Sequence, residues 1–194
     1  MPTREDLVAV DREIVALKKR RVELVQSLPP EPVSDYTFQT LDGKVRLSDL
    51  FGDAADLFVV HNMGRSCRWC TLWADGLAGL YPHLSSRAPF VLSSPDSPRV
   101  QAEFAASRRW PFRMVSVQGS SFPKDMGYMD ADGDPGPGVS VFHRLPSGQM
   151  VRTGHDRFGP GDDYCALWPL FDLLKGGVGD WEPQYRYEAA VTGS

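Results

Sequence analysis

The first part of the chain has apolar side chains at the spacing of an amphipathic helix. Thr3 and Asp6 have the spacing of a capping box, in which each side chain accepts a hydrogen bond from the other residue's backbone N–H. Pro29 and Pro30 should end the helix, because proline cannot continue the helical hydrogen-bond ladder. The pattern therefore predicts one helix over residues 4–27. Its apolar stripe, with arginine and glutamate between the members, consists of Leu7, Val10, Ile14, Leu17 and Leu24.

This apolar stripe allows two placements of the helix. The helix could pack on the body of its own chain, or it could pair with the same helix of a second copy as in a coiled coil. Arg21 interrupts the stripe, and the sequence leaves both placements open. A homodimer through this helix is therefore one of two hypotheses. We expect residues 1–32, the helix and a proline-rich linker, to form one unit and residues 33–194 to form the main domain.

Beyond the prolines, short apolar runs alternate with segments of helical periodicity. The runs 57–61 and 90–93 are typical of strands buried on both faces. Alternating strands and helices followed by a hairpin predict an α/β fold, a central mixed sheet with helices on both faces. A loop rich in Gly, Pro and Asp is expected over roughly 119–138, with its acidic run 130–134 at the surface. Strands are expected at 36–41, 45–47, 57–61, 90–93, 112–117, 139–142 and 150–153, and helices at 67–84, 97–109 and 162–175.

The composition excludes several classes of partner. The chain has 194 residues, of which 42% are hydrophobic and 24% charged, an ordinary globular balance. Its 21 basic and 25 acidic residues leave a net charge of −4, and the basic residues are scattered, so nucleic acid is not an expected partner. No stretch approaches the ~18 apolar residues of a membrane span, and the N-terminus lacks a signal-peptide pattern. We expect a cytoplasmic protein.

Candidate chemistry is concentrated at Cys67-Arg68-Trp69-Cys70, directly after the buried run 57–61. Backbone N–H groups and the dipole at a helix N-terminus stabilise a thiolate, and in CxxC motifs the thiol pKa can fall from ~8.5 toward ~7. Arg65 and Arg68 add positive charge beside the first cysteine. The pattern predicts Cys67 as a nucleophile and Cys70 as the resolving thiol.

Two other interpretations of the pair stay open. CxxC is a standard half of a zinc site, but no second CxxC or HxxxH is present, and His83 should lie at the far end of the helix. Free cysteines also serve as small buried hydrophobes, which is the expected role of Cys165 in the last helix. His61 could orient a thiol, although a structural role is favoured. No metal or organic cofactor is therefore predicted.

A substrate or partner groove is expected around the pair. Trp69 lies between the cysteines and could set the apolar surface that a partner contacts, and Asp75 could be a buried proton acceptor or a solvated helix residue. The groove is predicted to comprise Arg65, Arg68, Trp69, Trp73, Asp75 and Pro137.

The region from Tyr36 to Leu77 resembles the opening of a thioredoxin-like or peroxiredoxin-like domain. More closely, the chain resembles the bacterial thioredoxin-like proteins of domain-of-unknown-function family 899. The shared sequences are Cys67-x-x-Cys70, Trp73-Ala74-Asp75-Gly76, Ser120-Ser121-Phe122, Pro137-Gly138-Val139-Ser140-Val141-Phe142 and the tail around Trp181-Glu182-Pro183-Gln184-Tyr185-Arg186-Tyr187. The resemblance implies a thioredoxin-like fold over nearly the whole chain and gives Pro137 the position of that superfamily's cis-proline.

Two departures from related enzymes bear on activity. Peroxiredoxins have a Thr three residues before the reactive cysteine. The residue three positions before Cys67 is Gly64, and the residue three positions before Cys70 is Cys67 itself. Thioredoxins have Gly-Pro between their cysteines, where this chain has Arg68-Trp69. The favoured hypothesis is a cytosolic thiol–disulfide oxidoreductase acting on protein or small-molecule disulfides. The alternatives are a non-catalytic thioredoxin-fold binding module and an atypical peroxiredoxin-like peroxide reductase.

Overall fold

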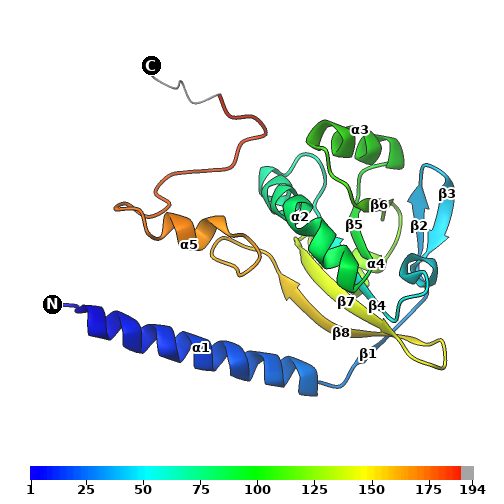
Figure 1. Ribbon diagram of the computed structural model, residues 1–194. Coiled ribbons are helices and arrows are strands. Elements are labelled where there is room, and N and C mark those ends of the chain that lie inside the picture. The colour runs from blue at the N-terminus through cyan, green and yellow to red at the C-terminus, as the bar shows by residue number, and fades with distance from the viewer. Residues whose placement is uncertain (189–194) are drawn as a thin grey trace.

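An eight-stranded mixed sheet is the centre of the computed structural model, which describes residues 1–188 (Figure 1). The strands are β1 (Glu31–Val33), β2 (Thr37–Thr40), β3 (Gly43–Arg46), β4 (Asp56–His61), β5 (Phe90–Ser94), β6 (Arg113–Ser116), β7 (Gly138–Arg144) and β8 (Met150–Arg157). Their spatial order is β1-β8-β7-β4-β5-β6-β2-β3. β4, β5 and β6 are parallel, whereas β7 is antiparallel to both β4 and β8. The mixed sheet and the hairpin after the βαβ units, as predicted, are confirmed.

Helices cover both faces of the sheet. They are α1 (Arg4–Ser27), α2 (Arg68–Arg87), α3 (Pro98–Arg108), α4 (Phe122–Asp125) and α5 (Leu167–Phe171), with the short 3₁₀ helix η1 (Leu47–Phe51). Side chains alternate along β4, so Leu57 and Val59 enter one core cluster and Val60 enters the other. The first cluster includes Phe122 of α4, and the second includes Trp73 of α2. A continuous apolar strand is therefore buried from both sides.

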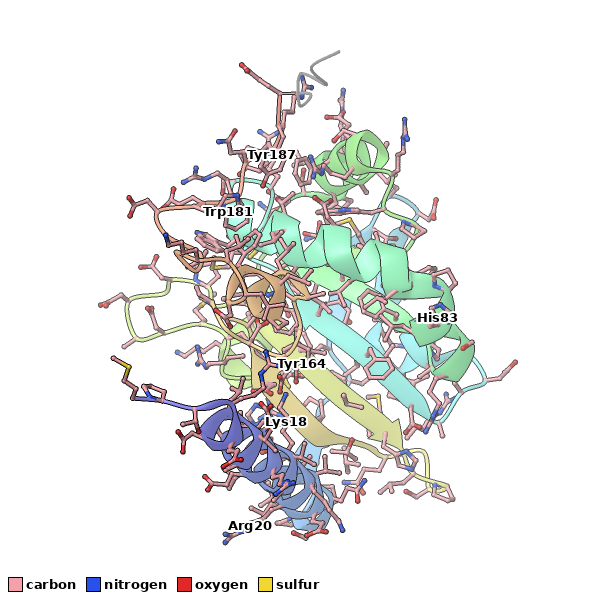
Figure 2. The ribbon with its side chains drawn as sticks, turned by 60° about the vertical axis from the view of Figure 1, so that its left-hand side comes forward. Lys18, Arg20, His83, Tyr164, Trp181 and Tyr187 are labelled. Carbon is pink, nitrogen blue, oxygen red and sulfur yellow. The ribbon has the colours of Figure 1, made fainter. Side chains whose placement is uncertain are left out.

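The N-terminal helix begins and ends as predicted, and Thr3 and Asp6 form the capping box. None of its residues is buried. Lys18 Nζ lies 2.5 Å from a carboxylate oxygen of Asp163, and Arg21, which interrupts the apolar stripe, pairs with Asp156 of β8. Figure 2 shows Lys18 on the side of α1 nearest the segment that carries Tyr164. The helix is thus attached to its own subunit mainly through basic side chains.

Two predicted segments are wrong in extent. Of the helix expected over 162–175, only α5 forms, with Pro169 in its first turn, where the missing N–H leaves no helical hydrogen bond unmade. The side chain of Asp162 accepts hydrogen bonds from the N–H groups of Tyr164 and Cys165 and makes a turn before α5. The segment expected to be a loop over 119–138 contains the short helix α4 and contributes buried side chains to the core, whereas its acidic run 130–134 is exposed as predicted.

The proline-rich linker contains a strand that the sequence did not predict. β1 pairs with β8, with Glu31 opposite Arg152 and Val33 opposite Met150. Pro32 is tolerated because β1 is an edge strand, where one row of N–H groups needs no partner. The guanidinium of Arg152 donates to Glu31 at 2.8 Å and secures this edge. Among residues 1–188, no helix has the length and apolar character that a membrane span requires.

Candidate active site at the cysteine pair

Cys67 is the N-cap residue of α2, which confirms the helix start predicted at the cysteine pair. Its Sγ accepts a hydrogen bond from the backbone N–H of Cys70 at 3.1 Å. Its carbonyl oxygen accepts from both the N–H and the hydroxyl of Thr71, at 3.1 and 3.0 Å. Cysteine sulfur therefore takes the place that a Ser or Asp side chain usually occupies at an N-cap. The helix N-terminus is directed at the candidate nucleophile.

The loop from β4 to α2 is held by two side chains that sequence reasoning did not select. Asn62 accepts from the N–H of Gly64 at 2.7 Å and donates to the carbonyl of Cys70 at 3.4 Å. Asp96 accepts from the N–H of Arg65 at 2.7 Å. Gly64 has φ +99°, and a Cβ there would lie 2.9 Å from Asp96 Oδ2, so glycine is required. The sequence did contain one indication that Asp96 is near the site. Asp96 closely follows β5, whose carboxyl end lies beside that of β4.

The two cysteines have opposite environments although both are free thiols. Cys67 is half-buried, whereas Cys70 is 2% exposed and its Sγ accepts the N–H of Met63 at 3.3 Å. A hydrogen bond from the Cys70 thiol, with the backbone N–H groups of Cys70 and Trp69, lowers the pKa of Cys67 to about 6 against the opposing effect of burial. The same hydrogen bond, with burial, raises the pKa of Cys70. At neutral pH the pair is one thiolate and one thiol.

The C-terminal tail lies across the start of α2. Tyr185 donates its hydroxyl to the carbonyl of Arg65 at 3.0 Å, and Arg68 Nη2 lies 2.8 Å from Glu182. The ring of Trp181 packs edge-on against that of Trp69 at 6.3 Å. Figure 2 shows Trp181 beside the start of α2, with His83 at the opposite end of this helix. The structure thus brings Arg65, Arg68 and Trp69 together with tail residues to which the sequence analysis assigned no role. The many aromatic residues of the tail were the sequence feature that could have indicated this contact.

Trp73 and Asp75 lie away from this surface. Trp73 is buried in the core cluster beneath α2. Asp75 accepts hydrogen bonds from the guanidinium of Arg108 and from Nε1 of Trp110, the latter at 2.8 Å. Arg108 also donates to the carbonyl of Tyr185 at 2.6 Å. Asp75, whose side chain is 34% exposed, therefore fixes α2 to α3 and, through Arg108, to the tail, whereas Trp73 belongs to the protein core.

Pro137, to which the resemblance gives the position of the superfamily's cis-proline, is in the trans form, as are all peptide bonds of residues 1–188. Its carbonyl accepts the N–H of Phe158 at 3.0 Å and extends the β7–β8 ladder, a backbone role that trans geometry satisfies. The next residue, Gly138, pairs with His61 at the end of β4. A Cβ on Gly138 would lie 2.3 Å from both the carbonyl of Asp156 and the ring of Tyr128, so this position accepts only glycine.

His61 has the structural role that the sequence favoured. Its Nε2 lies 2.9 Å from the hydroxyl of Ser140, and its ring stacks on Tyr128 with centroids 3.7 Å apart. Burial lowers the pKa of His61 to about 3, so the imidazole is neutral. Cys165 is buried in the second core cluster. Within the described part of the chain, no group of three or more His, Cys, Asp or Glu side chains is arranged to hold a metal ion.

Comparison with known protein families shows which family the chain belongs to. The family described as "Bacterial protein of unknown function (DUF899)" matches residues 2–187. The chain belongs to this family. The resemblance noted from the cysteine motif and the tail is confirmed, and the match covers α1 and nearly all of the tail as well as the sheet of this DUF899 protein. No curated protein matches the sequence.

Solved structures of several peroxiredoxins are similar in fold to this DUF899 protein. Peroxidoxin BcpB from Mycobacterium tuberculosis is 23% identical, with a TM-score of 0.52 over 63% of this chain and 80% of that one. Reduced Prx3 from Vibrio vulnificus is 15% identical, with a TM-score of 0.55 over 70% and 89%. AhpC from Enterococcus faecalis is 13% identical, with a TM-score of 0.52 over 69% and 82%. At these identities the likeness concerns the fold, and the predicted thioredoxin-like fold is confirmed.

Proposed function

We propose that this protein is a thiol–disulfide oxidoreductase in which Cys67 is the nucleophile and Cys70 is the resolving thiol. One observation carries the proposal: the Cys67 sulfur caps α2 and accepts hydrogen bonds that lower its pKa to about 6. A low pKa, partial exposure and a second thiol within hydrogen-bond reach are the properties of a redox-active cysteine. We also place the reaction in the cytoplasm, where cellular reductants keep both thiols reduced.

The proposed reaction has two exchange steps. The Cys67 thiolate attacks one sulfur of a substrate disulfide, a mixed disulfide forms, and the second substrate sulfur leaves as a thiolate that takes a proton from water. The negative charge on Cys67 is then gone, and with it the interaction that raises the pKa of Cys70. Cys70 loses its proton and attacks the sulfur of Cys67, which releases the second substrate thiol and leaves a Cys67–Cys70 disulfide. An external dithiol supplies the two electrons that restore the enzyme.

The pH dependence of alkylation tests the thiolate directly. Because the pKa of Cys67 is lowered to about 6, its thiolate is lost as pH falls through that value and is fully formed at neutral pH. The rate of Cys67 alkylation by iodoacetamide, read by mass spectrometry, should rise between about pH 5 and 7 and then level off. Cys70 should stay unmodified in the same samples, because it is buried and its pKa is raised.

Cys165→Ser provides the matched control for alkylation, since this change removes the third thiol without touching the pair. A midpoint at or above ~8.5 for Cys67 would contradict the proposal and favour the non-catalytic binding module. Assays with hydrogen peroxide and with disulfide substrates on the same protein separate the two enzymatic alternatives. A peroxide reductase would oxidise Cys67 to a sulfenic acid and release water before Cys70 forms the disulfide.

We further propose that α1 pairs with α1 of a second copy. Its stripe residues Leu17 and Leu24 are 63% and 55% exposed, while Arg21 holds the helix to Asp156 of β8 and Lys18 holds it to Asp163 beyond β8. Burial of a leucine contributes about 1.5–3 kcal/mol, so Leu17→Glu should raise the dimer dissociation constant at least about tenfold in sedimentation experiments. Lys19→Glu adds the same side chain on the opposite side of the helix and should leave the dimer intact. A wild-type protein that stays monomeric at high concentration would exclude this pairing.

A further inference from the structure

A cavity of about 620 Å³ lies between the start of α2, α5 and the C-terminal tail. Aromatic rings form much of its wall, and they come from Trp69, Trp168, Phe171 and Trp181. The rings meet at varied angles: Trp69 lies 5.9 Å from Trp168 at 37°, and Trp181 lies 4.9 Å from Phe171 at 72°. Both faces and edges of aromatic rings therefore surround the space. Its volume is within the range of about 300–1,000 Å³ that is typical of ligand pockets.

The charged residues around the cavity are all of one sign. Asp172, Asp180 and Glu182 line it, and none of the described residues that line it is basic. Glu182 is paired with Arg68, whose guanidinium lies 2.8 Å away. Within residues 1–188, neither Asp172 nor Asp180 has an ion-pair or side-chain hydrogen-bond partner. Aromatic faces attract cations through the ring quadrupole, and nearby carboxylates add to this attraction. The cavity therefore has the chemistry of a site for an organic cation.

The same residues connect the cavity to the nucleophile. Trp69 contributes its indole ring to the wall, and its backbone N–H is one of the donors to the sulfur of Cys67. Arg68, the residue next to Cys67, contacts Glu182 at the cavity. A ligand in this space thus contacts Trp69, two positions from the attacking sulfur, and Glu182, which is paired with the residue next to that sulfur. This placement favours a part of the substrate over a remote effector.

We propose that the cavity receives a lysine or arginine side chain next to the disulfide that Cys67 attacks, so that the substrates are disulfide-bonded peptides or proteins with a basic residue beside the cysteine. This inference rests on the proposed oxidoreductase function. The long alkyl stem of either residue packs against the aromatic wall, and the charged end reaches Asp172 and Asp180. The cavity then supplies the substrate selectivity, while the cysteine pair supplies the chemistry.

The test compares two oxidised peptides that are identical except for lysine or norleucine beside one cysteine of an intramolecular disulfide. The second-order rate constant for oxidation of reduced protein is measured for each peptide. Wild-type protein should react about tenfold faster with the lysine peptide, which corresponds to ~1.4 kcal/mol. The double variant Asp172→Asn, Asp180→Asn should lower this ratio below about twofold. A matched control, Asp42→Asn with Asp53→Asn, removes two charges that do not line the cavity, one in the β2–β3 turn and one in the loop before β4, and should keep the ratio.

Equal rates for both peptides with wild-type protein, or an unchanged ratio in the cavity variant, would overturn the inference. Peptides with serine in place of both cysteines separate this failure from failure of the proposed function, because their affinity, measured by calorimetry, needs no redox chemistry. If neither disulfide is reduced but the lysine serine-peptide binds more tightly to wild type than to the cavity variant, the oxidoreductase proposal fails and the cation site is supported. If both disulfides are reduced equally and neither serine-peptide is preferred, the oxidoreductase proposal stands and the cation site is rejected.

Discussion

Cys67→Ser is expected to abolish disulfide reduction, with a rate loss of at least about 1,000-fold. A serine hydroxyl stays protonated at neutral pH, whereas the Cys67 sulfur has a pKa lowered to about 6 and is present as a thiolate. Serine can still cap α2, because its hydroxyl accepts the same backbone hydrogen bonds. The fold should therefore be unchanged, and the loss should be chemical. Reduction of a disulfide substrate with a chemical dithiol as electron donor measures the effect.

Cys70→Ser should give a different phenotype and so tests the assignment of roles. The first exchange still occurs, but no second thiol can resolve it, so a mixed disulfide with the substrate should accumulate and be visible as an added mass on Cys67. Cys165→Ser should keep wild-type rates, since this thiol lies in the core beneath Trp168 and makes no contact with the pair. Wild-type activity in Cys67→Ser would refute the catalytic mechanism, whatever the other variants show.

Phe122→Ala is expected to cause the largest loss of stability, about 3–5 kcal/mol in the free energy of unfolding. Phe122 is fully buried, and its ring lies 5.1 Å from Tyr36, 5.0 Å from Phe38 and 5.3 Å from His61. Removing the ring leaves a cavity among aromatic groups of β2, the residue before it and β4, which are held in the sheet and cannot collapse together. Urea denaturation followed by circular dichroism measures the change.

Leu41→Ala is the matched control for this prediction, because Leu41 is 65% exposed in the turn between β2 and β3. Its effect should stay within about 0.5 kcal/mol of wild type. A loss below about 1 kcal/mol for Phe122→Ala would mean that α4 does not close the core as described.

Local physics explains the elements that the sequence predicted well. The period of α1 and its Thr3–Asp6 capping box depend on residues within a few positions of one another. The continuous apolar run of β4 identifies a buried strand wherever its partners lie. Cys67 is an N-cap because its sulfur meets the N–H of Cys70, three residues on, and this interaction needs only the start of a helix. For the same reason the candidate chemistry was recognisable from the CxxC spacing.

Contacts between residues far apart in the sequence decided the features that the sequence did not predict. Phe122 and Tyr128 lie in a segment whose Gly, Pro and Asp content is typical of a loop. Both side chains are nevertheless buried in the core, because they cover the apolar side chains on that face of the sheet. Asp75 was ambiguous until Arg108 of α3 and Trp110, both more than thirty residues away in the sequence, supplied its partners.

The groups around Cys67 were likewise decided by the tertiary structure. The tail reaches the start of α2 across more than a hundred residues of chain, through Glu182 and Tyr185. The sequence by itself determined the thiol of Cys67, the helix that begins at it and the sheet behind it, because each follows from spacing along the chain. Only the tertiary structure decided what surrounds that thiol, because an aromatic cavity and its carboxylates are assembled from segments that no local pattern connects.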